Sequence, residues 1–153
     1  MANVSKTGTP TISTPAPTKE SLLTGLLAGE ALAGGDAVYV KTSDGALWIA
    51  TGAALNEAAE AIGLVCTPAS AGEPATVALF GSGIMFGYGP NVSGTATAAG
   101  TALYLGTGGA LANAATTGGI FPVAWAVGDG RICLQTPPWA MEIAVAALIA
   151  AIP

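Results

Sequence analysis

The chain has 153 residues, of which 52% are hydrophobic and only 8% are charged, with a net charge of −5 and no histidine. This length and composition suit one globular domain with a sizeable core, and they exclude intrinsic disorder over most of the chain. The four Lys and Arg residues are too few and too scattered for a nucleic-acid partner, whose binding needs clustered cations. A soluble monomer normally carries more surface charge, so we expect much of this surface to be covered by copies of the chain or by a larger assembly.

Residues 1–21 form a segment rich in Thr, Pro, Ser and Gly. Proline removes a backbone donor and favours extended conformations, and a short polar segment buries too little apolar area to order itself. We expect either a flexible tail or an extended arm that orders on a neighbouring subunit or on the surface of a partner. The candidate contact residues of this arm are Thr9, Pro10, Thr11, Ile12, Pro15, Pro17 and Lys19. The polar start of the segment predicts no secretory signal peptide.

The central part of the chain, residues 22–138, is predicted to form an all-β domain. Runs of β-branched and aromatic residues recur at 37–40, 47–49, 62–65, 76–80, 84–86, 102–105, 123–127 and 130–134. Turn residues such as Asp44-Gly45 separate these runs, and Asp-Gly between two strand-like runs favours a hairpin. This regular spacing is typical of a barrel or sandwich. Residues 53–60 lack the pattern and are expected to form a helical turn or a loop.

Two parts of the β domain resemble each other, at about residues 26–81 and 95–136. The matching pieces are GGDAVYV at 34–40 with AGTALYL at 99–105, DGAL at 44–47 with GGAL at 108–111, and residues 62–65 with 123–126. Sequence rich in Gly and Ala aligns with itself easily, but the match also pairs Tyr39 with Tyr104. We therefore predict a duplicated small β module with approximate internal two-fold symmetry.

The C-terminal residues 139–153 are predicted to form a short apolar helix. Two prolines precede it, a helix-start signal, and Met141, Val145, Leu148 and Ile152 recur at helical spacing. Further apolar residues lie off this stripe, so the helix should be buried on several sides, against its own β domain or against other copies. The candidate oligomer-interface residues are Trp139, Ile143, Leu148 and Ile149. The apolar run is shorter than the roughly 20 residues of a bilayer span, so no membrane partner is expected.

No motif in the chain indicates catalysis. Without histidine, Ser-His and Cys-His nucleophilic pairs within the chain are excluded. The Gly-Ser-Gly at 81–83 lacks the frame of a nucleophile elbow because Phe80 stands where that frame needs glycine. The glycine-rich pieces at 87–89 and 106–109 fit neither the dinucleotide nor the phosphate-loop pattern. We therefore predict no catalytic residue, no cofactor and no enzymatic activity.

The two cysteines, Cys66 and Cys133, each lie in an apolar run. Cysteine in such a setting is usually a buried reduced thiol, and we interpret both in this way. A disulfide between them stays open, because two positions alone do not determine pairing. A metal site needs more ligands than these, and no carboxylate cluster supplies them, so we predict no metal.

Several motifs follow one another in a recognisable order over residues 26–135. They are LAGEA at 27–31, AGGDAVYV at 33–40, IGLV at 62–65, AGEP at 71–74, TVAL at 76–79 and AGTALYL at 99–105. Their order and spacing resemble the capsid decoration, or cement, proteins of tailed bacteriophages. The segment before Leu22 and the apolar segment after Pro138 depart from the pattern of that family.

The resemblance implies a small β-barrel or β-tulip fold and a structural virion protein. It implies that the protein binds the major capsid protein on the outer surface of the phage head and reinforces the shell against the pressure of packaged DNA. It also implies a homo-oligomer, most commonly a trimer, assembled in the cytoplasm of the host bacterium.

A second interpretation is a head-fibre or tail-associated β module that binds the host or a carbohydrate. This interpretation predicts exposed aromatic platforms, for which Trp48, Tyr88 and Trp125 are the candidates. Packing of these rings in the core is the competing expectation, because Trp48 and Trp125 lie inside strand-like runs. A small hydrolase is a third class, which no motif supports.

Overall fold

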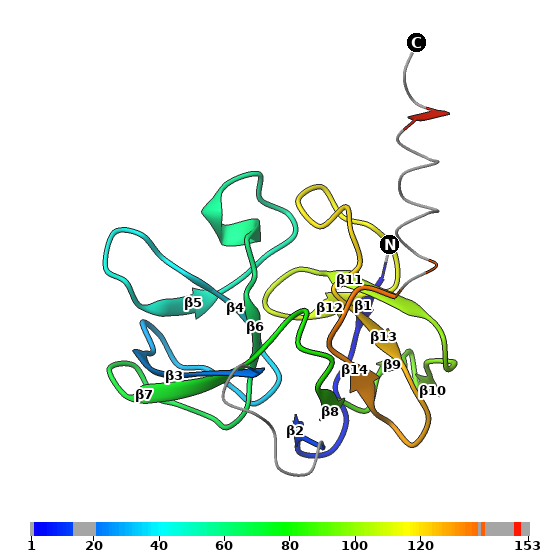
Figure 1. The fold of residues 1–153 in the computed structure, drawn as a ribbon, viewed down its shortest axis with the longest axis horizontal. Helices are drawn as coiled ribbons and strands as arrows, with labels where there is room; N and C mark the ends of the chain where they lie inside the picture. Colours follow the sequence, from blue (N-terminus) through cyan, green and yellow to red (C-terminus); the bar gives the residue numbers. More distant parts are fainter. Residues whose placement is uncertain (1, 14–20, 138, 140–148, 151–153) are drawn as a thin grey trace.

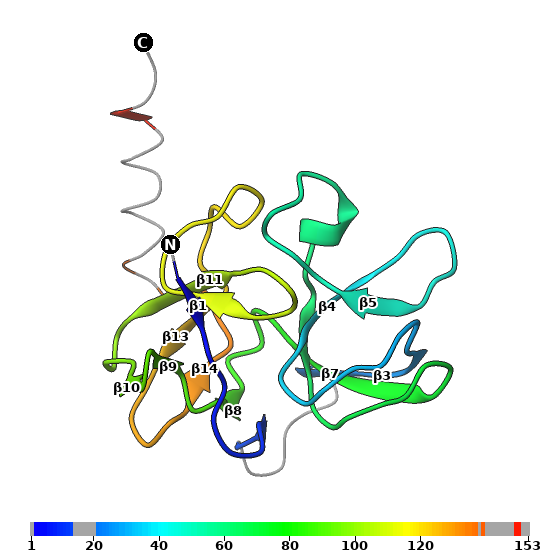
Figure 2. The same ribbon diagram turned by 180° about the vertical axis from the view of Figure 1, so that it is seen from behind.

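The described part of the chain, residues 2–13, 21–137, 139 and 149–150 of a computed structural model, is all-β. Its strands form a five-stranded sheet, a seven-stranded sheet and a two-stranded ribbon. Figures 1 and 2 show the two larger sheets side by side, as two lobes of one body. The expected all-β class is therefore confirmed.

The first lobe carries the five-stranded antiparallel sheet. Its strands are β3 (Leu22–Leu27), β4 (Ala37–Val40), β5 (Leu47–Ile49), β6 (Gly63–Val65) and β7 (Pro74–Leu79), in the order β3-β7-β6-β4-β5. Between β5 and β6 lies the 3-10 helix η2 (Glu57–Ala59), where a helical turn or loop was expected. The side chain of Asn56 caps η2 by accepting a hydrogen bond of 3.0 Å from Ala58 N.

The second lobe carries the seven-stranded antiparallel sheet and the two-stranded ribbon. The sheet consists of β1 (Asn3–Val4), β12 (Leu111–Ala112), β11 (Ala102–Leu105), β13 (Ala124–Ala126), β14 (Ile132–Cys133), β8 (Met85–Gly87) and β2 (Thr11–Ile12), in that order. The ribbon pairs β9 (Asn91–Val92) with β10 (Thr95–Ala96). The N-terminal strands β1 and β2 thus form the two edges of a sheet whose other strands come from residues 85–133.

The two larger sheets share one strand order. Without β1 and β2, the order β8-β14-β13-β11-β12 corresponds strand by strand to β3-β7-β6-β4-β5. The registers correspond as well, because Val38 lies opposite Gly63 in the first lobe and Leu103 lies opposite Ala124 in the second. The positions outside β8 and β12 are occupied by β2 and β1.

The described strands do not close into a barrel. Each larger sheet keeps two separate edges, β3 and β5 in the first lobe and β1 and β2 in the second. A barrel requires its first and last strands to pair with a consistent stagger, and no such pair is present among the described strands. The closed barrel, one of the two architectures expected from the turn spacing, is therefore not formed by the described strands, whereas the regular alternation of short strands and turns is confirmed.

Two hydrophobic clusters form the core. The larger one joins the lobes, since it contains Tyr39 and Leu64 of the first lobe together with Phe86, Tyr88 and Leu103 of the second. The smaller one lies in the first lobe and includes Leu32, Val38, Leu47, Val65 and Val77. Successive residues of a strand point to opposite faces, which is why β4 contributes to both clusters.

The C-terminal helix predicted over 139–153 lies mostly outside the described residues. Trp139, Ile149 and Ala150 have helical backbone conformation, and the boundaries predicted at 21 and 138 stay predictions. In the described part of the chain, no helix combines the length and the apolarity needed to cross a membrane.

Candidate functional site

The N-terminal segment, residues 2–13, runs along its own chain. Asn3 and Val4 pair with β12, Ser5 exchanges backbone hydrogen bonds of 2.7 and 3.0 Å with Asn91, and Thr11 and Ile12 pair with β8. The Asn3 Nδ2 atom also donates a hydrogen bond of 2.7 Å to Thr107 Oγ1. The segment therefore crosses from one edge of the second-lobe sheet to the other, and it is ordered by contacts within the chain.

An ion pair joins this segment to the first lobe. Lys6 Nζ lies 2.7 Å from Asp36 Oδ1 and also donates to Gly34 O at 3.2 Å. The second carboxylate oxygen of Asp36 accepts a hydrogen bond of 2.8 Å from Ala33 N. Asp36 is the single buried charged residue of the described chain, so Lys6 supplies its counter-charge.

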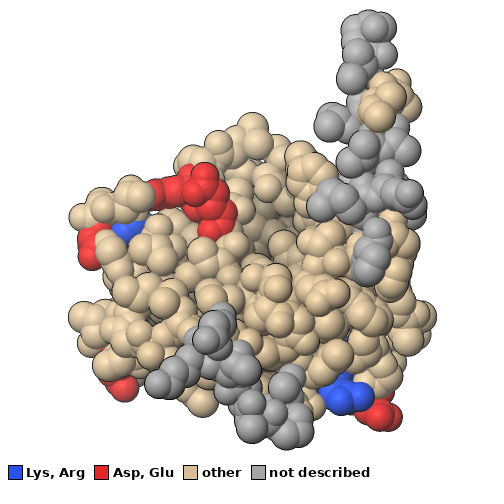
Figure 3. Space-filling view, in the orientation of Figure 1, with Lys and Arg blue, Asp and Glu red and all other residues tan. Residues whose placement is uncertain are grey.

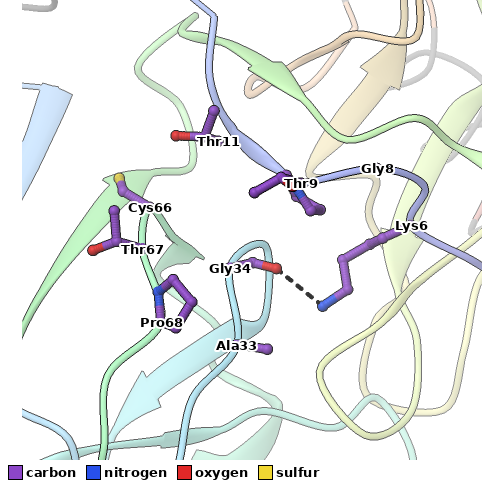
Figure 4. Close-up of a pocket in the computed structure, with 10 residues that line it drawn as sticks. Lys6, Gly8, Thr9, Thr11, Ala33, Gly34, Cys66, Thr67 and Pro68 are labelled. Carbon is purple, nitrogen blue, oxygen red and sulfur yellow. Dashed lines mark hydrogen bonds between the residues drawn. The ribbon is translucent and has the colours of Figure 1, made fainter.

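An open cleft of about 430 Å³ lies between the N-terminal segment and the first lobe (Figure 4). Lys6, Gly8, Thr9, Pro10 and Thr11 form one wall, and Ala33, Gly34, Cys66, Thr67 and Pro68 form the other. A Cβ at Gly34 would lie 2.8 Å from the Pro10 carbonyl oxygen, so glycine permits this close approach. Of the candidate arm residues, Thr9, Pro10 and Thr11 therefore share one cleft wall.

The other candidate arm residues are placed differently. Ile12 lies opposite Phe86 in the sheet and packs against the larger core cluster. Pro15, Pro17 and Lys19 lie outside the described residues. A contact of the segment with a neighbouring subunit or a capsid stays a prediction.

Both cysteines are buried free thiols. Burial raises the pKa of the Cys66 thiol to about 11, and burial also raises the pKa of Cys133. At neutral pH both groups are therefore protonated, and a protonated thiol is a poor nucleophile. The described ranges contain no group of three or more His, Cys, Asp or Glu residues placed to hold a metal ion.

The candidate aromatic platforms are engaged within the chain. Tyr88 is fully buried, and its hydroxyl accepts a hydrogen bond of 3.3 Å from Leu111 N. The indole of Trp48 donates to Asp44 Oδ2 at 3.1 Å, and Lys41 Nζ lies 4.4 Å from its ring centroid. Tyr88 is therefore a core residue rather than a platform, and Trp48 is half-buried.

The third candidate, Trp125, is half-buried on β13 and contacts Trp139 edge to face. The two ring centroids lie 5.4 Å apart with an interplanar angle of 71°. Of the candidate interface residues, Trp139 is 44% exposed and Ile149 is 62% exposed, whereas Ile143 and Leu148 lie outside the described residues. The described candidates are thus available for contact with another chain.

A further apolar surface was not predicted from the sequence. Leu55, Ile120 and Phe121 are 81%, 54% and 40% exposed, and we call these three residues the loop patch. They lie on the loops that follow β5 and β12, which are joined by a hydrogen bond of 2.7 Å from Gly118 N to Gly52 O. The one sequence signal for this patch is the pair Ile120-Phe121 inside a loop between glycine and proline.

A shallow hollow of about 130 Å³ borders the loop patch. The described residues that line it carry no charge and are Ala59, Ala61, Leu105, Gly118, Gly119, Ile120, Phe121 and Val123. Comparison with known proteins finds no matching family model and no matching curated protein.

Proposed function

We propose that this chain is a capsid decoration, or cement, protein, a structural component of a tailed-bacteriophage virion. It binds the major capsid protein on the outside of the head and stabilises the shell. It acts there as a homo-oligomer, a trimer, and has no enzymatic activity. The broad uncharged face that Figure 3 shows is the observation that carries this proposal.

Charged side chains lie towards the rim of the face in Figure 3, and the centre of that face, over both lobes, is uncharged. Burying a charge against another protein costs desolvation free energy, whereas Ala, Gly and Thr surfaces are buried without that cost. The cores of protein interfaces are accordingly depleted of charged residues. Such a face suits a protein that functions while bound to a larger assembly.

The fold supports the same proposal. The shared strand order and corresponding registers of the two lobes support a duplicated β module of β-tulip type, which the resemblance to decoration proteins implies. Tyr39 and Tyr104, the paired tyrosines of the repeat, lie on the corresponding strands β4 and β11. The first of them lies opposite Trp48, and the second lies opposite Ala112.

The cleft beside the N-terminal segment is the proposed capsid contact. Thr9 and Thr11 are exposed, belong to the predicted contact residues and face a cleft in which Lys6 is the sole charged residue among the described lining residues. An extended segment of the capsid protein fits an open cleft of about 430 Å³. In a trimer three such contacts act together, so modest individual affinities give a high overall affinity.

The test uses virus particles assembled from a genome in which the reading frame for this chain is deleted. Purified chain is added back, and binding is measured by co-sedimentation and by the temperature at which packaged DNA is released. We expect binding to saturate at a fixed number of copies per particle and to raise the release temperature. Absence of co-sedimentation, or binding confined to tails, would overturn the proposal.

A matched pair of variants tests the contact itself. Thr9→Asp with Thr11→Asp places two charges in the cleft wall, and we expect it to lower capsid occupancy. Thr95→Asp changes an exposed strand threonine on β10, away from the cleft, and should leave occupancy unchanged. Equal occupancy for both variants would exclude the cleft as the capsid contact.

A further inference from the structure

We infer that the loop patch of one chain binds the C-terminal segment, residues 139–153, of a second copy of the same chain. This inference deepens the proposed function, because it rests on the chain being a homo-oligomer. It names both partners of the interface predicted at Trp139, Ile143, Leu148 and Ile149.

The loop patch is held in place by backbone contacts. Gly118 N donates to Gly52 O at 2.7 Å, and Thr116 Oγ1 donates to Leu105 O at 2.8 Å. A Cβ at Gly118 would overlap the carbonyl oxygen of Ala54, so the two loops lie in close contact. The three exposed apolar side chains are therefore presented on a preformed surface, which lowers the entropy cost of binding.

The hollow beside the patch has the size of one side chain. A dry cavity of about 150 Å³ accommodates a benzene molecule, so the hollow of about 130 Å³ matches one branched aliphatic side chain. Its described lining residues are uncharged, and three of them, Ala59, Ala61 and Val123, present small or medium apolar side chains. The hollow therefore fits an isoleucine or leucine from an apolar segment.

The C-terminal segment supplies such side chains. Glu142 is its single charged side chain, and its branched apolar residues are Ile143, Val145, Leu148, Ile149 and Ile152. Trp139, at the start of the segment, is anchored by its edge contact with Trp125. Ile149 is 62% exposed, so most of this residue is accessible to a partner.

The placement of the segment identifies a second copy as the partner. Figures 1 and 2 show residues 149–150 beyond the same end of the molecule as the loops after β5 and β12, but apart from these loops in both views. The described residues 149–150 of a chain thus lie away from its own loop patch. When the segment of one chain covers the patch of the next, the contact is heterologous, and heterologous contacts close into rings such as a trimer.

The test combines two variants with native mass spectrometry at micromolar concentration. The patch variant carries Ile120→Asp and Phe121→Asp, and the segment variant lacks residues 140–153 but keeps Trp139. Leu27→Asp is the matched control, because Leu27 is 49% exposed on β3 of the first lobe. Urea unfolding and circular dichroism establish that each variant is folded.

We expect the full chain and the Leu27 variant to form the same oligomer, and each of the other two variants to be monomeric. An equal mixture of the patch variant and the segment variant should form a heterodimer, since one supplies the intact segment and the other the intact patch. A monomeric full chain, an unchanged oligomer in the patch variant, or a mixture without heterodimer would each overturn the inference. An unchanged oligomer in the patch variant, together with a monomeric segment variant, would show instead that C-terminal segments bind each other.

Failure of this inference and failure of the proposed function give different results. If the heterodimer forms but the full chain does not bind capsids, the patch-to-segment contact stands and the capsid proposal fails. If the full chain binds capsids and the mixture stays monomeric, the capsid proposal stands and the inferred contact is wrong.

Discussion

Lys6 Nζ lies 2.7 Å from Asp36 Oδ1, and this ion pair ties the N-terminal segment to the turn before β4. The two side chains retain 24% and 11% of their exposure, so the pair is partly desolvated. Because β1 and β2 flank Lys6 along the chain, the pair also fixes how the N-terminal segment passes between the two lobes.

Replacing Lys6 by Met should destabilise the fold by about 1–3 kcal/mol, because it leaves the Asp36 carboxylate buried without its counter-charge. Urea unfolding measures this loss, and Lys41→Met serves as control because Lys41 contacts Trp48 at the surface. In a double-mutant cycle with Asp36→Asn, the double variant should recover part of the stability. A free energy of unfolding equal to that of the unmodified chain would show that the pair contributes nothing.

Replacing Gly118 by Ala should separate the loops that carry the loop patch. Its Cβ would overlap the carbonyl oxygen of Ala54, and relieving such a clash costs about 1–3 kcal/mol. Gly128→Ala is the matched control, since a Cβ there meets nothing within 4 Å, and its effect should stay within about 1 kcal/mol. If both substitutions shift the urea midpoint equally, the close contact of the loops is contradicted.

Stability should fall at alkaline pH because of Tyr88. Burial raises the pKa of Tyr88 from 10.0 to about 12, so the folded chain keeps a proton that the unfolded chain loses. Below pH 10 the hydroxyl is protonated in both states, and the free energy of unfolding keeps the full contribution of Tyr88. As the pH rises from 10 to about 12, the free energy of unfolding falls by about 2–3 kcal/mol. The measurement is the free energy of unfolding from neutral to alkaline pH.

Tyr88→Phe isolates this effect. At neutral pH it should cost about 1 kcal/mol, because Leu111 N loses its acceptor. Above pH 10 the variant should lose less stability than the unmodified chain. The raised pKa of Cys66 adds an alkaline loss that begins near pH 9, and it is common to both proteins. Parallel pH profiles would contradict the role given to Tyr88.

The reactivity of Cys66 should report opening of the N-terminal segment. Cys66 is 6% exposed and lines the cleft behind Pro10, so its alkylation in the folded chain requires local opening. Lys6→Met should raise its alkylation rate roughly tenfold if the ion pair contributes about 1.4 kcal/mol to closure. Cys133 lies on β14 and serves as the internal control. A parallel acceleration of both thiols would indicate global unfolding instead.

Many strands of the two larger sheets were predictable, because short stretches of the sequence itself favour a strand there. The runs at 37–40, 47–49 and 102–105 are strands with the predicted bounds, and each of the other five predicted runs overlaps a strand. β-Branched and aromatic residues between turn signals favour strands independently of the rest of the chain. Strand β3 was not predicted, because Gly25 interrupts its apolar run with φ +93° and a register shift.

The N-terminal strands and the loop patch depended on contacts between distant residues. β1 and β2 are two-residue strands that exist only through pairing with β12 and β8, which no local pattern indicates. Lys6 and Asp36 are 30 positions apart, and the loops that carry Leu55 and Phe121 meet through backbone hydrogen bonds. A sequence pattern specifies local preferences, whereas these contacts arise from the packing of the two lobes.

Cryo-electron microscopy of the virus particles whose genome encodes this chain shows whether the chain coats the outside of the phage head. We expect density for the two-lobed β body on the outer surface of the shell, repeated at equivalent lattice positions and absent from particles that lack the reading frame. Purified particles without the chain, or density confined to the tail or the interior, would contradict the proposal.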